Sequence, residues 1–315
     1  MKLAFVFPGQ GSQSVGMMAP FADRPAVRDT FAAASAALGQ DLWQLVADGP
    51  VEDLARTVNT QPVMLTAGVA VYREWIAGGG QRPALVAGHS LGEYAALVAA
   101  DAMTLADAVP LVRFRAQSMQ DAVPEGTGAM AAILGLSDDD VRAACVEASE
   151  ATGLIVEAVN FNAPSQVVIA GNKAAVEKAL ETTKARGAKR GVLLPVSAPF
   201  HSSLLKPAAD KLADRLKAVA ISVPSVPVIH NVDLTISTSP DAVRSALARQ
   251  AASPVLWVDT IRRIAADGVT HIGECGPGKV LAGLVKRIAP EIQCVALTDP
   301  AALLSLQLAL KGCTT

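Results

Sequence analysis

The chain alternates short runs of apolar residues with longer stretches in which apolar residues recur at helical spacing. Residues 3–7 form an apolar run that ends at a segment rich in Gly and Pro, which predicts a short buried strand followed by a loop. Helical spacing dominates from 24 to 75 with an interruption near Gly49-Pro50, residues 84–87 predict a second strand, and helical composition returns at 93–100. Alternation of near-continuous apolar strands with helices favours a parallel sheet covered by helices.

The middle of the chain has a different order of predicted elements. These are strand 129–134, helix 137–150, strands 155–160 and 166–170, helix 172–186 and strand 191–195. The order β-α-β-β-α-β is typical of a ferredoxin-like domain. Because the first pattern lies on both sides of it, we predict an α/β large domain of residues 1–125 and 197–315 and an inserted ferredoxin-like domain of residues 126–196.

After the inserted domain the pattern predicts further helices and two short strands. These are helices 206–219, 241–250 and 258–267 and strands 226–230 and 270–273.

The charge balance excludes some classes of partner. The 315 residues include 27 Lys and Arg against 29 Asp and Glu, so the formal net charge is -2. Such a chain has no overall field to hold a nucleic acid backbone or an anionic membrane surface. Its apolar runs are shorter than the roughly 18 residues needed to span a bilayer. With 51% hydrophobic and 18% charged residues, disorder is also excluded, and we expect neither a nucleic acid nor a membrane partner.

The four cysteines and the first residues bear on the compartment. The cysteines lie far apart without a C-x-x-C pair, which argues against a disulfide framework and a zinc site. The apolar start meets Pro8 and Gly9 before the core of a signal peptide could form. We expect a cytoplasmic protein, without bound metal and monomeric.

Residues 88–92 read Gly-His-Ser-Leu-Gly and match G-x-S-x-G, the nucleophile elbow. The motif follows an apolar strand and begins a helix, whose N-terminus supplies backbone N–H groups for an oxyanion. Ser90 is therefore the candidate nucleophile. The alternative is a Gly-rich turn between strand and helix with a capping serine.

Ser90 needs a base, and the chain has four histidines. His89 is adjacent to Ser90, and adjacent side chains diverge at a sharp elbow, which indicates a supporting contact. His230 and His271 lie at the ends of apolar strands, where packed histidines are common. His201 lies in a Pro-containing loop just after the inserted domain, and by elimination it is the best candidate base.

Arg115 projects from a largely apolar face of a predicted helix at about 104–120, whereas Arg113 shares its face with glutamines and is predicted to be solvated. A guanidinium on a core-facing stripe needs a partner, and bidentate pairing with a carboxylate is its best interaction. That carboxylate belongs either to an internal Asp or Glu or to a substrate. Pro110 lies inside the helix and predicts a kink or a later start.

Taken together, these segments resemble the malonyl-CoA:acyl carrier protein transacylases of fatty acid synthesis and the acyltransferase domains of polyketide synthases. The matching segments run in family order: 7–13, 88–94, Arg115 with 119–120, 163–171, 198–201 and 276–281.

The resemblance implies a hydrolase-like large domain with the active site in the cleft beside the inserted domain. It implies that Ser90 attacks a malonyl thioester, that His201 acts as base and then acid, and that Arg115 binds the malonyl carboxylate. The remaining implied site residues are Gln10 and Leu91, whose backbone N–H groups form the oxyanion hole, Gln250, whose main-chain carbonyl orients His201, and Phe200, which crowds out an α-methyl branch.

The implied reaction is ping-pong transfer of malonyl from malonyl-CoA to the phosphopantetheine thiol of acyl carrier protein, with no metal or tightly bound cofactor. Carrier proteins are acidic, and basic residues of this chain form the expected docking surface, unless they are only solvated helix ends. These are Lys184, Arg186, Lys189, Arg190, Lys279, Lys286 and Arg287.

Three alternatives stay open at this point. The first is a serine hydrolase or thioesterase that releases a free acid. The second is malonyl loading for a polyketide or malonate decarboxylase system, and the third is a carrier-docking protein without catalysis.

Overall fold

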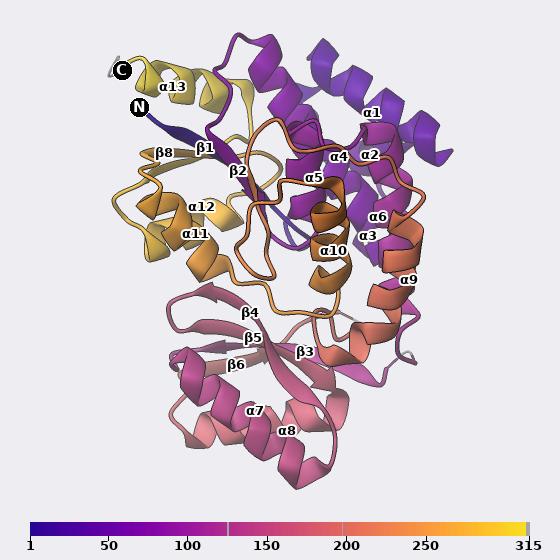
Figure 1. Cartoon of the computed structure of the whole chain (residues 1–315), viewed down its shortest axis with the longest axis vertical. Coiled ribbons are helices and arrows are strands. Elements are labelled where there is room, and N and C mark those ends of the chain that lie inside the picture. Colours follow the sequence, from indigo (N-terminus) through magenta and orange to yellow (C-terminus); the bar gives the residue numbers. More distant parts are fainter. Residues whose placement is uncertain (125, 197, 313–315) are drawn as a thin grey trace.

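The computed structural model describes residues 1–124, 126–196 and 198–312 and contains two separate sheets (Figure 1). The larger sheet has five strands, all paired in parallel. In spatial order they are β7 (Val228–Ile229), β2 (Leu85–Gly88), β1 (Leu3–Phe7), β8 (His271–Glu274) and β9 (Gln293–Ala296). The predicted parallel sheet of an α/β protein is confirmed.

Strand β1 shows why this sheet needs helices on both faces. All five of its residues are buried, and successive side chains of a strand point to opposite faces. Leu3, Phe5 and Phe7 enter one apolar cluster, whereas Ala4 and Val6 enter a second. Phe5 packs edge-to-face on Tyr72 and Trp75 of α4, with ring centroids 5.7 and 5.3 Å apart.

The helices supply those two apolar clusters. On the Phe5 side lie α1 (Pro25–Leu38), α4 (Thr57–Ala77), α5 (Gly92–Ala99) and α6 (Leu105–Gln120), and on the Val6 side lie α11 (Trp257–Ala266) and α12 (Val280–Ile288). Apart from the two helices of the small sheet, the other helices are the 3₁₀ helices Ala19–Phe21 and Ser203–Leu205, α2 (Leu42–Asp48), α3 (Val51–Ala55), α9 (Lys206–Leu216), α10 (Pro240–Gln250) and α13 (Pro300–Leu310). No helix of the described residues combines the length and the apolar character needed to cross a membrane.

The smaller sheet is antiparallel and lies below the larger one in Figure 1. Its spatial order is β4 (Val156–Ala163), β5 (Gln166–Asn172), β3 (Gly128–Leu134) and β6 (Arg190–Leu193). Helices α7 (Asp138–Thr152) and α8 (Lys173–Ala185) cover it and complete the order β-α-β-β-α-β. The structure thus has the separate small sheet that the sequence predicted.

The two sheets are joined where β4 meets the segment before α11. The N–H of Val255 donates to the carbonyl of Val159 at 2.8 Å, and the N–H of Phe161 donates to the carbonyl of Val255 at 3.0 Å. The expected boundaries near Gly126 and Val196 lie just outside the strands of the small sheet, and the boundary residues 125 and 197 lie outside the described residues.

Some predicted elements differ from the observed ones. The helical stretch 24–75 consists of four helices, because further breaks at Gly39 and at the extended Arg56 add to the expected interruption at Gly49-Pro50. Strand 226–230 is reduced to the two residues of β7. After residue 273, α12, β9 and α13 form from short segments that the pattern did not resolve.

Candidate active site

Ser90 stands at a sharp turn between β2 and α5. Its φ of 52° lies in the left-handed region, which residues with a side chain seldom adopt and which is concentrated at functional sites. A Cβ on Gly88 would lie 1.9 Å from the carbonyl carbon of Gly92, and a Cβ on Gly92 would lie 2.0 Å from the carbonyl oxygen of Phe7. Both glycines are therefore needed for this turn to form against β1.

The hydroxyl of Ser90 contacts the imidazole of His201, with 2.7 Å between Oγ and Nε2. On the other side of the ring, Nδ1 is 2.9 Å from the main-chain carbonyl oxygen of Gln250. A carbonyl oxygen only accepts, so Nδ1 carries the proton and Nε2 is free to take one from Ser90. This arrangement can activate a serine hydroxyl without an acidic third residue.

His201 is buried, and its environment disfavours the protonated ring. Burial, the nearby Arg115 cation and His89 lower the pKa of His201 to about 3, against the smaller opposing effect of the Gln250 carbonyl. The ring is therefore neutral near pH 7, which is the state a general base needs. His201 also has a positive φ of 67°, so its position is fixed by an uncommon backbone conformation.

Arg115 lies in the buried core of the site, with only 2% of its surface exposed. Its Nη1 donates to Gln61 Oε1 at 2.7 Å, and its Nη2 donates to Gln250 Oε1 at 2.9 Å and to Ser90 Oγ at 3.2 Å. Among the described residues it forms no ion pair with Asp or Glu. Burial lowers the pKa of Arg115, but a guanidinium stays charged at neutral pH.

The structure tests three expectations about this helix. The predicted internal partner of Arg115 is not found among the described carboxylates, because Gln61 and Gln250 occupy the positions around it. Helix α6 begins at Leu105 with Thr104 as its N-cap and continues through Pro110, so the prediction of a later start is wrong. Arg113 is not fully solvated as predicted, since it is half-buried and donates to Gln40 and Asn59.

Gln10, Ser90 and Leu91 line the same cavity, and their backbone N–H groups differ in whether they are already bonded. The N–H of Ser90 itself donates to Asn231 Oδ1 at 2.7 Å and is therefore occupied. The N–H groups of Gln10 and Leu91 have no acceptor among the described residues. Leu91 is the N-cap of α5, where the helix dipole favours negative charge. Free N–H groups at a helix N-terminus are suited to hold an oxyanion.

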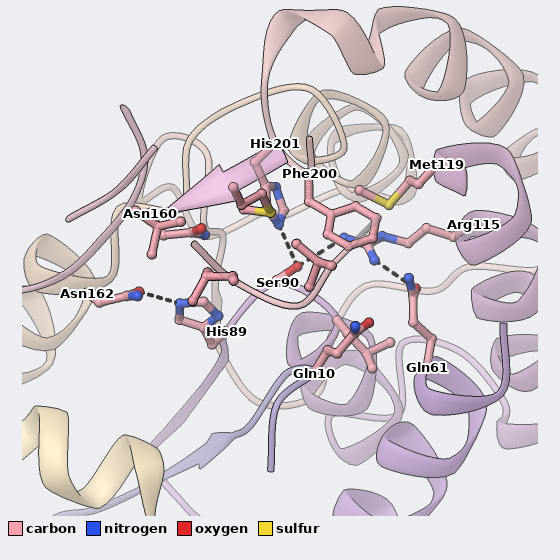
Figure 2. A pocket seen from close by; sticks show the side chains of 15 residues that line it. Gln10, Gln61, His89, Ser90, Arg115, Met119, Asn160, Asn162, Phe200 and His201 are labelled. Atoms are coloured by element: carbon pink, nitrogen blue, oxygen red, sulfur yellow. Dashed lines mark hydrogen bonds between the residues drawn. The ribbon is translucent and has the colours of Figure 1, made fainter. Parts of the chain in front are cut away.

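Ser90, His201 and Arg115 all line one cavity of about 190 Å³ (Figure 2). Its polar part also includes Gln10, Gln61, His89, Asn160 and Asn162. The small sheet and the chain that follows it supply Met130, Val168, Leu194, Val196 and the half-buried Phe200. The cavity thus combines polar side chains, of which Asn160 and Asn162 come from β4, with apolar side chains from the small sheet and the chain that follows it.

Residues 4–289 match the acyl transferase domain family. The chain belongs to this family. It is 56% identical over 303 residues to the malonyl CoA-acyl carrier protein transacylase of Escherichia coli strain K12, covering 96% of this chain and 97% of that protein.

Solved structures agree with the acyl transferase family. The acyl-carrier-protein S-malonyltransferase of Burkholderia pseudomallei 1710b superposes with a TM-score of 0.96 at 60% identity, covering 98% of this chain and 99% of that chain. A malonyl-transacylase solved in complex with its type II PKS acyl-carrier protein has a TM-score of 0.96 at 49% identity, covering 98% and 100%. The chain is an acyltransferase, and the resemblance found in the sequence is confirmed.

The basic residues expected to dock a carrier lie outside the cavity of this acyl transferase domain. Lys189 and Arg190 are exposed at the start of β6, and Arg190 is in register with Leu134, which also pairs with Gln166 of β5. Arg287 of α12 donates to Gln166 and, at 2.9 Å, to the carbonyl of Pro164, and Lys286 beside it is exposed. Arg190 and Arg287 therefore lie at the same end of the small sheet, whereas Arg186 is paired with Glu147.

The other histidines hold supporting positions. His89 lines the cavity, and its Nε2 is 2.7 Å from Asn162 Oδ1. Burial lowers the pKa of His89. His230 is fully buried between Glu93 Oε1 at 2.6 Å and Ser237 Oγ at 2.7 Å, and His271 is buried beside Thr270. Only His201 contacts Ser90 among the four.

Sequence reasoning missed several residues that hold the site together. Gln61, Asn231 and Glu93 are buried. Gln61 accepts from the guanidinium of Arg115, and Asn231 bonds the backbone of the elbow at Ser90 and Gly88. Glu93 accepts from the N–H of Asn231. Glu93 lies three residues after Ser90, and a carboxylate among Leu, Tyr and Ala in a buried helix was a signal that a partner exists. Gln61 and Asn231 carried no such signal in the sequence.

Proposed function

We propose that this acyltransferase transfers malonyl from malonyl-CoA to the phosphopantetheine thiol of acyl carrier protein through a malonyl ester on Ser90. The observation that carries the proposal is the buried Arg115 guanidinium, which has no described acidic partner and lies 3.2 Å from Ser90 Oγ. A buried cation without a counter-charge is costly, and a carboxylate on the acyl group would provide one. The names of the E. coli and B. pseudomallei relatives support the same substrate.

In the first half-reaction, His201 Nε2 takes the proton of the Ser90 hydroxyl as Oγ attacks the thioester carbonyl carbon. The carbonyl oxygen becomes an oxyanion, held by the N–H groups of Gln10 and Leu91. When the tetrahedral intermediate collapses, the carbon–sulfur bond breaks and the coenzyme A sulfur takes the proton back from His201. Malonyl-Ser90 and free coenzyme A are the products.

The second half-reaction runs the same steps in reverse with a different thiol. His201 removes the proton from the phosphopantetheine thiol, the sulfur attacks the malonyl ester, and Ser90 recovers its proton from His201. Throughout, the main-chain carbonyl of Gln250 holds the Nδ1 proton and stabilises the imidazolium that forms.

Arg115 binds the free carboxylate of the acyl group in this proposal. The guanidinium presents parallel donors that match a carboxylate, so it orients malonyl with its thioester towards Ser90. Phe200 and the apolar side of the cavity limit the width beside the α-carbon, which disfavours an α-methyl branch. Acetyl lacks the carboxylate and gains nothing from Arg115.

Lys189, Arg190, Lys286 and Arg287 form the proposed docking surface for the acidic carrier protein. Their exposure and the position of Arg190 and Arg287 at one end of the small sheet support this, because one face can then contact both. The complex of a malonyl-transacylase with its carrier supports the class of partner. A cytoplasmic location, a monomeric state and independence of a bound cofactor stay predictions.

The competing function is a serine hydrolase or thioesterase that releases malonate to water. The experiment is a chase of the malonylated enzyme, first in buffer and then with carrier protein bearing its pantetheine arm. We expect slow loss of malonyl in buffer and rapid appearance of malonyl on the carrier. Rapid release of malonate with no malonyl on the carrier would decide for the hydrolase. A panel of fatty acid and polyketide carriers, with malonate decarboxylase carriers included, would identify the pathway.

A further inference from the structure

Gln250 uses both its main chain and its side chain in the site. It is fully buried in the last turn of α10. The carbonyl oxygen of its main chain accepts from His201 Nδ1 at 2.9 Å, whereas its side-chain Oε1 accepts from Arg115 Nη2 at 2.9 Å. Its Nε2 donates to the Ser90 carbonyl at 2.9 Å and to Glu93 Oε2 at 2.8 Å. One residue therefore contacts the base, the guanidinium and the elbow through different atoms.

The side-chain amide of Gln250 has only one satisfactory orientation. Glu93 Oε2 also accepts from the N–H of Asn231 at 3.0 Å, and the carbonyl of Ser90 is likewise an acceptor. The NH2 group of the amide must face these two acceptors, so Oε1 must face Arg115. His230 Nδ1, 2.6 Å from Glu93 Oε1, holds the carboxylate in place.

Gln61 holds the guanidinium from the opposite side, at Nη1. Its own amide is oriented by Thr57, because Gln61 Nε2 donates to the Thr57 hydroxyl at 3.2 Å, which in turn donates to Gln10 Oε1 at 2.9 Å. Arg115 is thus fixed between two neutral amides. Neutral acceptors position the guanidinium without neutralising it, so its charge stays available to a substrate carboxylate. An internal Asp or Glu in the same place would neutralise that charge.

We propose that the side chain of Gln250 is a positioning residue that sets acyl selectivity by holding Arg115 against the acyl carboxylate, independently of the hold of its main chain on His201. The inference rests on the proposed malonyl transfer. The long, flexible side chain of Arg115 is less well oriented when one of its two amide acceptors is removed. The main-chain carbonyl that accepts from His201 is present whichever residue is at position 250. The two functions of Gln250 are therefore separable by mutation.

The experiment compares wild type with Gln250→Met, which keeps the length of the side chain and removes its hydrogen bonds. The kcat and KM of malonyl-CoA and of acetyl-CoA are measured as acyl donors. Arg115→Ala and the double variant Arg115→Ala with Gln250→Met are measured in parallel. Gln307→Met, whose glutamine bonds the Gly78 carbonyl far from the cavity, is the matched control and should behave as wild type.

We expect Gln250→Met to reduce the malonyl-over-acetyl ratio of kcat/KM by about tenfold, the effect of weakening one hydrogen bond to a charged group. Most of the change should appear in the KM for malonyl-CoA. In the Arg115→Ala background the same substitution should not change the ratio further. The rate at which Ser90 reacts with a neutral fluorophosphonate should fall by less than about threefold, because His201 keeps its main-chain partner.

Proportional loss of malonyl and acetyl transfer, or an unchanged ratio, would overturn the inference. If Gln250→Met does not fold, Gln250→Leu also removes the amide and places no charge beside Glu93, and it should also reduce the ratio, so a wild-type ratio in that variant would be equally decisive. If Arg115→Ala leaves the ratio unchanged, the carboxylate clamp of the proposed function fails, and this inference fails with it. Absence of malonyl on Ser90 in the wild type would instead refute the proposed function itself.

Discussion

The two sides of the cavity are built on different principles. The polar residues around Ser90, here called the floor, are Gln61, Ser90, Arg115 and His201, which line the cavity, and Gln250, which lies behind them; they are joined by hydrogen bonds. The side formed by the small sheet and the residues after it, here called the wall, contains Met130, Val168, Leu194, Val196 and Phe200, which contact one another through apolar atoms.

The floor therefore determines the chemistry of the reaction, and the wall determines the shape of the acyl group that fits. Hydrogen bonds fix direction, so the floor is arranged before a substrate arrives, with the proton of His201 on Nδ1 and Arg115 bonded to neutral amides. Apolar contacts are non-directional and fix mainly volume. We therefore expect substitutions in the floor to alter rate and charge selectivity, and substitutions in the wall to alter tolerance for acyl width.

The largest effect is expected for Ser90→Ala. Removing the nucleophile should reduce malonyl transfer at least about 10,000-fold, because no second hydroxyl of the floor contacts His201. Steady-state transfer to the carrier is the measurement. Ser203→Ala, two residues after His201 and exposed, is the matched control and should retain wild-type transfer. Substantial transfer by Ser90→Ala would remove Ser90 from the mechanism.

Gly92→Ala tests whether the floor depends on the tight elbow. The new Cβ would lie 2.0 Å from the carbonyl oxygen of Phe7, which belongs to rigid backbone. We expect the free energy of unfolding to fall by about 3 kcal/mol, measured by chemical denaturation, with loss of acylation. Gly283→Ala in α12 has open space around the new Cβ and should be neutral or stabilising by up to about 1 kcal/mol. Equal effects of the two substitutions would contradict the steric account.

Arg115→Ala tests charge selectivity in the floor. We expect the malonyl-over-acetyl ratio of kcat/KM to fall about 100-fold, because a charge-assisted pair with the acyl carboxylate is lost. Arg113→Ala in the same helix is the control, since Arg113 bonds Gln40 and Asn59 and does not line the cavity. It should affect stability and leave the ratio unchanged. A similar fall in malonyl and acetyl transfer by Arg115→Ala would exclude the clamp.

Phe200→Ala tests the wall. The half-buried ring packs with Met130 and Val168, and its removal widens the cavity beside the acyl group. We expect methylmalonyl transfer to rise about tenfold relative to malonyl transfer, the usual selectivity of a pocket for one methyl group. Competition between the two thioesters measures this ratio. Phe114→Ala, away from the cavity, should not change it, and an unchanged ratio in Phe200→Ala would show that the ring does not limit width.

The smallest effect is expected between pH 5 and 7. The pKa of His201 is lowered to about 3 chiefly by burial and next by Arg115, so the rate of Ser90 acylation should change less than about twofold in this range. In Arg115→Ala the pKa of His201 should rise and bring the acid limb to higher pH. In the unfolded chain a histidine has a pKa near 6.5, so below this pH the unfolded chain binds a proton that the folded His201 does not. His201 therefore lowers the free energy of unfolding as pH falls below about 6.5. An inflection near 6.5 in wild-type acylation would contradict the environment described for His201.

Much of the fold and the centre of the site could be predicted from the sequence. Residues 3–7 and 84–87 are near-continuous apolar runs, a pattern that only a sheet covered on both faces accommodates, and they became β1 and β2. The G-x-S-x-G motif identified the elbow because Gly88 and Gly92 leave no room for a Cβ, the first against the turn itself and the second against Phe7 of β1. These signals lie in consecutive residues.

The parts that could not be predicted depend on contacts between distant segments. Arg113 is predicted to be solvated from its helix face, but Gln40 and Asn59 come from other elements and cover it. The internal or substrate partner of Arg115 stayed open because the amides of Gln61 and Gln250 lie 54 and 135 residues away in the sequence. Asn231, which holds the N–H of Ser90, belongs to a loop without any motif.

The most direct test of the account is the mass of the intact enzyme after a brief incubation with malonyl-CoA, followed by peptide mapping. The account predicts one malonyl group per chain, attached as an ester to Ser90 and removed when carrier protein with its pantetheine thiol is added. Ser90→Ala should remain unmodified under the same conditions. Release of coenzyme A without a malonyl adduct, or an adduct on another residue, would contradict the account.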